Sequence, residues 1–171
     1  MDTPAFQQWM QRFRATITGP FDREGEPPAE PMVTHSDDAV WLESDITGTP
    51  SRIGVLLDQP AHTFELYLQE IGVNGSSDMQ RHVHESVHCV ISGSGYSEIG
   101  SRRYEWGPGD FVYTPPFMWH RHYNAGDEVV RMILVENSAV LGFLGLNRRD
   151  SAGLVTYGEL QEKHQRDNGQ R

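Results

Sequence analysis

Residues 107–124 read GPGDFVYTPPFMWHRHYN, and this stretch decides the fold of the chain. It opens on a turn signal, GPGD, and continues into FVYT, whose aromatic and β-branched side chains favour a strand. It ends with two histidines one residue apart, His120 and His122. Side chains two positions apart on a strand lie on one face of the sheet. The stretch therefore predicts a β scaffold that carries a pair of imidazoles on one face.

A second histidine-rich stretch lies upstream, at residues 80–99, QRHVHESVHCVISGSGYSEI. It contains His82, His84 and His88, which share one parity if the chain stays extended. Imidazole is a common ligand of Fe, Ni, Cu and Zn, and a metal site needs three or four convergent ligands. A β-barrel can bring these two distant stretches together, so we expect a metal site. The isolated histidines are expected to stay outside it: His35, His62 and His164.

The region between Val40 and Glu136 alternates short β-rich runs with turn signals such as VNGSS, GSG, GPGD and NAGDE. This cadence is typical of a single all-β sandwich or barrel, and closing the barrel removes exposed strand edges. The expected strands are VWLES, RIGVLLD, TFELYLQEIGV, VHCVISG, YSEI, RYEW, DFVYTP and VVRMILVE.

The ends of the chain differ from this central region. Residues 4–18 predict an amphipathic helix, capped by Asp2 or Thr3, with one apolar face. Residues 19–31 predict an irregular linker, and residues 139–150, AVLGFLGLNRRD, a short helix or closing turn. We expect an arm at 1–39 packed on the barrel, the barrel at 40–157, and a polar, flexible tail at 158–171. The apolar face of the N-terminal helix is formed by Phe6, Trp9, Met10, Phe13 and Ile17.

Composition narrows the function classes. The formal net charge of −10 disfavours nucleic acid and anionic membranes as partners. The single cysteine, Cys89, excludes an intramolecular disulfide and a cysteine-rich zinc site. No leader-like stretch opens the sequence, and no apolar run approaches the ~20 residues of a membrane span. We therefore expect a cytoplasmic protein that acts on a small molecule, and a homodimer or higher homo-oligomer.

Both histidine-rich stretches resemble the two sequence motifs of the cupin superfamily. In residues 107–124, Gly109-Asp110, Pro115, His120 and Asn124 fall at the spacing of the second motif, while Phe117 stands where the family usually has glycine. Over roughly residues 50–150 the chain looks most like the gentisate 1,2-dioxygenase group. The resemblance implies an all-β cupin fold, a double-stranded β-helix. The residue patterns add the N-terminal helix and a short C-terminal helical segment on either side of it.

The first motif departs from the family pattern of two histidines, a glutamate and a closing glycine turn. In one frame, Gln80 and His82 take the paired-histidine positions, Ser86 takes the glutamate position, and His88 follows on the inward face. In the other frame, His82 and His84 form the pair and His88 replaces the glutamate. The flanking residues favour the first frame, whereas histidine chemistry favours the second.

Both frames contain His82 and His120, so these two are the ligands on which the alternatives agree. Metal ligation is predicted for His82, His84, His88 and His120. His122 is predicted to be catalytic, as a proton donor or by orienting substrate. Gln80 is predicted to be catalytic or substrate-binding, as a weak ligand, by holding a water on the metal or by binding substrate, and Arg131 is predicted to bind substrate. Arg131 fits a substrate carboxylate if it points inward and is merely solvated if it points outward.

An all-histidine ligand set disfavours Mg and Ca. One divalent ion per chain is expected, with Fe(II) implied by the resemblance and Ni, Zn, Mn or Cu also compatible. The resemblance implies a dioxygenase that uses O₂ to cleave a carbon–carbon bond of a small hydroxylated aromatic or dicarbonyl compound. The alternatives are a lyase, isomerase or decarboxylase that uses the metal as a Lewis acid, and a non-catalytic cupin that binds a small ligand.

Overall fold

The structure of the protein is a computed structural model that describes residues 3–17, 32–47, 51–57, 59 and 61–169. The chain forms two compact units, Met1–Glu30 and Pro31–Arg171. The predicted linker at 19–31 lies outside the described residues.

In the first unit, helix α1 spans Pro4–Ile17. The hydroxyl of Thr3 accepts a hydrogen bond from the backbone N–H of Phe6 at 3.3 Å, so Thr3 caps the helix as expected. The rings of Phe6 and Trp9 stack with centroids 6.0 Å apart, and those of Trp9 and Phe13 with centroids 5.2 Å apart. The predicted helix and its aromatic face are confirmed.

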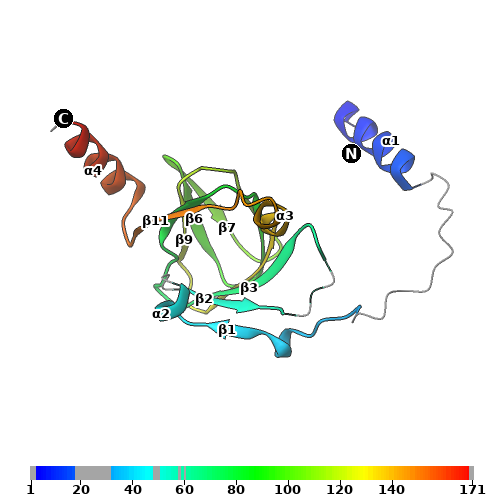
Figure 1. Cartoon of the computed structure of the whole chain (residues 1–171), viewed down its shortest axis with the longest axis horizontal. Helices are drawn as coiled ribbons and strands as arrows, with labels where there is room; N and C mark the ends of the chain where they lie inside the picture. The colour runs from blue at the N-terminus through cyan, green and yellow to red at the C-terminus, as the bar shows by residue number, and fades with distance from the viewer. Residues whose placement is uncertain (1–2, 18–31, 48–50, 58, 60, 170–171) are drawn as a thin grey trace. The chain divides into compact units, whose positions relative to one another are not determined.

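In the second unit, the described strands form two antiparallel sheets (Figure 1). The first sheet has the order β1 (Val40–Leu42), β2 (Arg52–Val55), β3 (Glu65–Ile71), β10 (Val130–Glu136), β5 (Ser86–Ser92) and β8 (Phe111–Thr114). The second has the order β11 (Arg149–Gly153), β4 (Met79–His82), β9 (His120–Asn124), β6 (Gly95–Ile99) and β7 (Arg102–Trp106). The predicted all-β architecture is confirmed.

Short helices connect or follow these strands. They are η1 (Ser36–Asp38), α2 (Ser44–Thr47), α3 (Ser138–Phe143) and α4 (Tyr157–Gly169). Thr156 and Glu159 form a reciprocal cap at the start of α4: the Thr156 hydroxyl accepts from the Glu159 N–H, and the Glu159 carboxylate accepts from the Thr156 N–H. Residues 158–169, predicted to be a frayed helix or a flexible tail, are helical. In the described part of the chain, helices are too short or too polar to cross a bilayer.

The barrel interior is apolar at one end and polar at the other. Along β10 and β5, Met132 lies opposite Val90, Leu134 opposite His88, and Glu136 opposite Ser86. The alternation of a strand directs all of these side chains to the same face. The apolar core contains Ile71, Val90, Trp106, Val112, Val130, Met132 and Leu134. The side chains at the polar end therefore pack against this apolar core, which restricts their movement.

Asn124 of the second motif has a structural role, in line with its interpretation as a turn former. Its side-chain N–H groups donate to the carbonyls of Ile71, Gly72 and Glu128, and its side-chain oxygen accepts from the N–H of Gly126. One buried amide thus joins the end of β3 to the turn between β9 and β10.

The backbone conformation of Phe117 explains why the resembled family usually has glycine at this position. Its φ of 60° lies in the left-handed region, which costs a residue with a side chain about 1–2 kcal/mol. The conformation turns the chain into β9, and the N–H of Phe117 donates to the carbonyl of His82 at 2.7 Å. The strained turn therefore ties the start of β9 to the end of β4.

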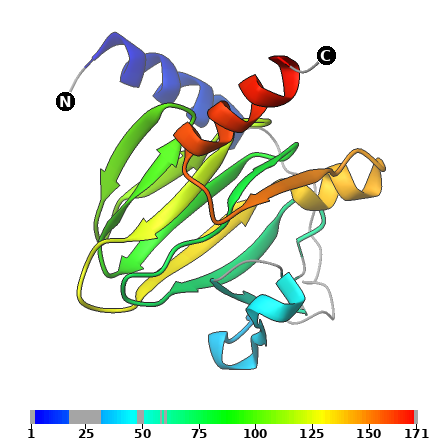
Figure 2. The same ribbon diagram turned by 90° about the vertical axis from the view of Figure 1, so that its left-hand side faces the viewer.

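Strand β11 is an element that the sequence pattern did not predict. Helix α3 occupies the first part of the expected helix or turn at 139–150, and the chain then continues through β11 to α4, from orange to red in Figure 2. Strand β11 pairs with β4, with Arg149 opposite His82 and Ser151 opposite Gln80. The second sheet therefore gains an edge strand beside the first histidine motif.

Gly95 offers a direct test of this packing. A Cβ added there would lie 2.0 Å from the carbonyl oxygen of Tyr123 and 2.6 Å from the Trp106 ring. We expect Gly95→Ala to lower the free energy of unfolding by about 3 kcal/mol in urea denaturation. Gly107→Ala is the control, because its Cβ would meet no atom within 4 Å. Equal stability of the two variants would contradict the β6–β9 arrangement.

Candidate metal centre

Five histidines are buried at the polar end of the barrel, and four of them form one cluster. His82 ends β4, His88 lies on β5, and His120 and His122 lie on β9. The ring centroids of His82 and His120 are 4.7 Å apart, those of His120 and His122 are 5.5 Å apart, and those of His88 and His122 are 4.4 Å apart. The fold thus joins residues from both motifs into one cluster.

Backbone carbonyls fix the tautomers of His82 and His120. Nδ1 of His82 lies 2.8 Å from the carbonyl oxygen of His84, and Nδ1 of His120 lies 2.9 Å from that of Met118. A carbonyl only accepts, so Nδ1 carries the proton in each ring and Nε2 keeps its lone pair. Metal-binding histidines in proteins commonly have this arrangement.

The hydrogen bonds of His88 imply the opposite tautomer. The Ser86 hydroxyl donates to Glu136 at 3.2 Å and lies 3.1 Å from Nε2 of His88. With its proton used in that way, the hydroxyl accepts from His88, so Nε2 of His88 carries the proton. The lone pair of His88 is then on Nδ1.

Three nitrogens of this cluster are buried without a hydrogen-bond partner among the described residues: Nδ1 of His88, Nε2 of His120 and Nε2 of His122. An unpaired buried polar atom costs about 1–3 kcal/mol. Three such atoms in one cluster require an explanation, and a bound ion or ordered water is the usual one. The donor chemistry of the cluster therefore fits a divalent metal.

The cluster is neutral near pH 7. Burial, followed by the charge of neighbouring histidines, lowers the pKa of His82 to about 4 and that of His88 to about 3. The same causes hold the pKa values of His120 and His122 well below the ordinary range. Neutral imidazole is the form that binds a metal.

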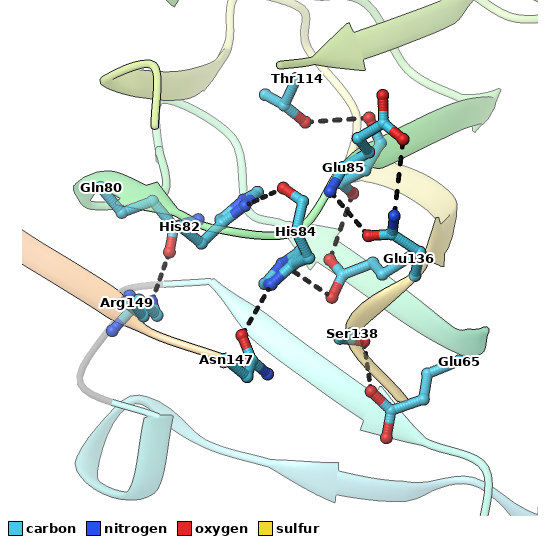
Figure 3. Close-up of polar contacts among 12 residues, drawn as sticks. Glu65, Gln80, His82, His84, Glu85, Thr114, Glu136, Ser138, Asn147 and Arg149 are labelled. Carbon is cyan, nitrogen blue, oxygen red and sulfur yellow. Dashed lines mark hydrogen bonds and ion pairs between the residues drawn. The ribbon is translucent and has the colours of Figure 1, made fainter. Parts of the chain in front are cut away.

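His84 has a different environment, although its ring stacks on that of His82 with centroids 3.7 Å apart. Its Nδ1 lies 3.2 Å from the side-chain oxygen of Asn147, and its Nε2 lies 3.2 Å from a carboxylate oxygen of Glu136 (Figure 3). Burial alone would lower the pKa of His84, but the hydrogen bond and charge of Glu136 outweigh it and raise that pKa. Both nitrogens of His84 are therefore occupied by acceptors.

Gln80 and Arg131 occupy contrasting positions. Gln80 lies opposite His120 in the β4–β9 ladder, and its side-chain oxygen accepts from Nε of Arg149 at 2.6 Å (Figure 3). Arg131 lies on the outer face of the first sheet, where 64% of its side chain is exposed and it pairs with Glu70. Of the two orientations considered for Arg131, the structure has the outward one.

A cavity of about 280 Å³ opens beside the cluster. Its wall includes His82, His84 and His88 together with Gln80, Glu136 and Arg149. Arg149 was missed in the sequence, because its strand is short and its flanking residues have no β-rich pattern. Larger hollows of about 300, 350, 500 and 530 Å³ in the described part of the chain have no histidine among the residues that line them.

The side chains do not yet form a complete coordination sphere. Within the described ranges, no group of three or more His, Cys, Asp or Glu side chains is arranged to hold a metal ion as it stands. His82 and His120 present lone pairs on Nε2, and their ring centroids lie 4.7 Å apart.

The pair between His84 and Glu136 predicts a pH dependence. In metal-free protein we expect Glu136→Gln to lower the pKa of His84, measured by NMR titration of the ring. The folded pKa lies above the ordinary 6.5, so the pair stabilises most below that pH and its contribution is lost as the pH rises through the folded pKa. Glu136→Gln should therefore destabilise the protein more at pH 6 than at pH 9. Glu162→Gln, an exposed change on α4, is the control; an unchanged His84 pKa in Glu136→Gln would contradict the assignment.

Comparison with known proteins supports the fold and gives a context for the site. The family model for the cupin domain matches residues 67–136. The chain is similar to 5-aminosalicylate 1,2-dioxygenase from Comamonas sp, with 33% identity over 76 residues, which is 44% of this chain and 20% of that protein. It is also similar to 1-methylthio-D-xylulose 5-phosphate methylsulfurylase from Rhodospirillum rubrum, with 29% identity over 84 residues, which is 49% of this chain and 54% of that protein.

Among solved structures, a cupin-2 domain protein from Rhodospirillum rubrum superposes with a TM-score of 0.56 and 22% sequence identity. The match covers 80% of this chain and 88% of that one. The two curated relatives are matched over only about a fifth and about half of their own lengths. Residues 67–136 therefore match the cupin domain in sequence, and the strand order and the solved structure agree with a cupin fold for this barrel.

Proposed function

We propose that this barrel is a metal-dependent dioxygenase of the Fe(II) type, which cleaves a carbon–carbon bond of a small hydroxylated aromatic or dicarbonyl compound. The observation that carries the proposal is the pair His82 and His120, which come from different motifs and have their Nε2 lone pairs fixed by backbone carbonyls. The similarity to a 5-aminosalicylate 1,2-dioxygenase supports the reaction class.

The third ligand is proposed to come from His88 or Gln80. Nδ1 of His88 is buried without a partner among the described residues, and Gln80 lies opposite His120 in the ladder. The hydrogen bonds of His84 to Asn147 and Glu136 make it a weaker candidate. This pattern supports the first of the two motif frames, in which Gln80 and His82 take the paired positions.

In such a site, the metal would supply open positions at which the adjacent oxygens of a substrate and O₂ meet. The residues of the chain provide the surroundings. The cavity orients a small substrate against His82, the apolar layer behind His88 limits water, and His122 supports His120 from the same strand face. Glu136 holds a proton on His84 at the cavity wall.

A Lewis-acid lyase, isomerase or decarboxylase is the second candidate, together with a non-catalytic cupin that binds a small ligand. The observation in its favour is the first motif, where Ser86 occupies the usual glutamate position and Gln80 is held by Arg149. The relative named as a methylsulfurylase shows that similar barrels occur in proteins with other activities. The homodimer and the cytoplasmic location remain predictions.

Metal analysis distinguishes these candidates. Protein purified without chelator should contain about one iron per chain and consume O₂ with gentisate or 5-aminosalicylate. His82→Ala and His120→Ala should each weaken metal affinity at least about tenfold, because each removes a fixed lone pair. His164→Ala, on the exposed face of α4, should leave the metal content unchanged. Stoichiometric zinc or nickel without O₂ uptake would support the Lewis-acid alternative, and metal retained in both site variants would refute the centre.

A further inference from the structure

Arg149 lies directly beside the proposed metal ligands. It is the first residue of β11, and the ladder places it opposite His82. Side chains opposite each other in an antiparallel pair have Cβ atoms about 4.5–5.5 Å apart and lie on the same face. The side chain of Arg149 accordingly forms part of the wall of the 280 Å³ cavity that also contains His82 and Gln80.

Two hydrogen bonds hold the guanidinium in place. Nε donates to the side-chain oxygen of Gln80 at 2.6 Å (Figure 3), and Nη2 donates to the carboxylate of Asp78 at 2.6 Å. Asp78 is 1% exposed and also accepts from the Ser151 hydroxyl, so this anchor belongs to the interior of the sheet. Within the described part of the chain, Nη1 of Arg149 has no hydrogen-bond partner. A fixed guanidinium with free donors loses little entropy when it binds an anion.

The charges of the cavity also favour an anion at this point. Among the described residues of its wall, Arg149 is the one lysine or arginine. The carboxylate of Glu136 is already paired with His84. Arg131, the arginine expected from sequence to bind substrate, points away from the barrel interior. The volume of about 280 Å³ suits a small ligand.

We propose that Arg149 is a specificity residue that binds the carboxylate of a small anionic substrate beside His82. A carboxylate is favoured over a phosphate because the carboxylates of Asp78 and Glu136 would repel a dianion more strongly than a monoanion. The inference rests on the proposed function for the rest of the substrate. The recognition of the anion by Arg149 is a separate property, which metal-free protein also has.

The test compares salicylate with its uncharged analogue salicylamide by calorimetric titration of metal-free and metal-loaded protein. The native protein should bind salicylate more tightly in both forms. The double variant Arg149→Gln/Asp78→Asn should lose about tenfold to a hundredfold of that preference, the usual value of hydrogen bonds to a charged group. The second substitution is needed because Asp78 would otherwise stay buried without its cation. Arg131→Gln is the matched control and should keep the full preference.

Each outcome bears on the proposal. A salicylate preference that survives in Arg149→Gln/Asp78→Asn, or that is absent from native metal-free protein, overturns it. Tighter binding of phenyl phosphate than of salicylate overturns the choice of a carboxylate. Arg149→Lys keeps the positive charge and a partner for Asp78 but lacks the two parallel N–H donors of a guanidinium. This variant should therefore lose part of the salicylate preference, which keeps the test valid even if the double variant fails to fold. A protein that binds no metal but keeps the preference would refute the proposed function and leave the role of Arg149 standing.

Discussion

The site depends on the contact between β4 and β9, because this contact brings the two histidine motifs together. The contact is small, with one residue pair in the ladder between the two strands. Gln80 lies opposite His120, the N–H of Phe117 donates to the carbonyl of His82, and the N–H of Ser77 donates to the carbonyl of His122. The strained turn at Phe117 is tolerated because it sets the point at which β9 begins, and that point determines which residues of β9 face the interior.

Once that junction is made, burial controls the chemistry of the imidazoles. Burial keeps four histidines neutral, because it lowers their pKa values and, at His82, outweighs the opposite effect of the Glu136 charge. His84, stacked on one of them, is the exception because Glu136 faces it. The barrel thus separates two kinds of histidine within a few ångströms, and the hydrogen bonds of His84 to Glu136 and Asn147 account for the difference.

The sequence predicted the barrel and the inward direction of His120 and His122, because strand alternation and turn chemistry are local properties. The sequence could not choose between the two frames of the first motif. His82, His84 and His88 all occupy even-numbered positions, so an extended strand would place all three on the same face. Strand β4 ends at His82, and hydrogen bonds from residues about fifty positions away then determine the environment of His84. Arg149 was beyond prediction for the same reason: its importance comes from pairing with β4, and RRDSAG has no strand pattern of its own.

Strand β11 lies outside the stretch that matches the cupin family model, since that match ends at residue 136. The residues proposed to hold a metal and the residue proposed to bind an anion are therefore encoded in separate parts of the gene. On that proposal, changes in the short segment after α3 would alter substrate preference while the histidine cluster stays intact. A barrel built in this way would diversify at its edge, and replacing that one strand would then be a route to new substrate specificity.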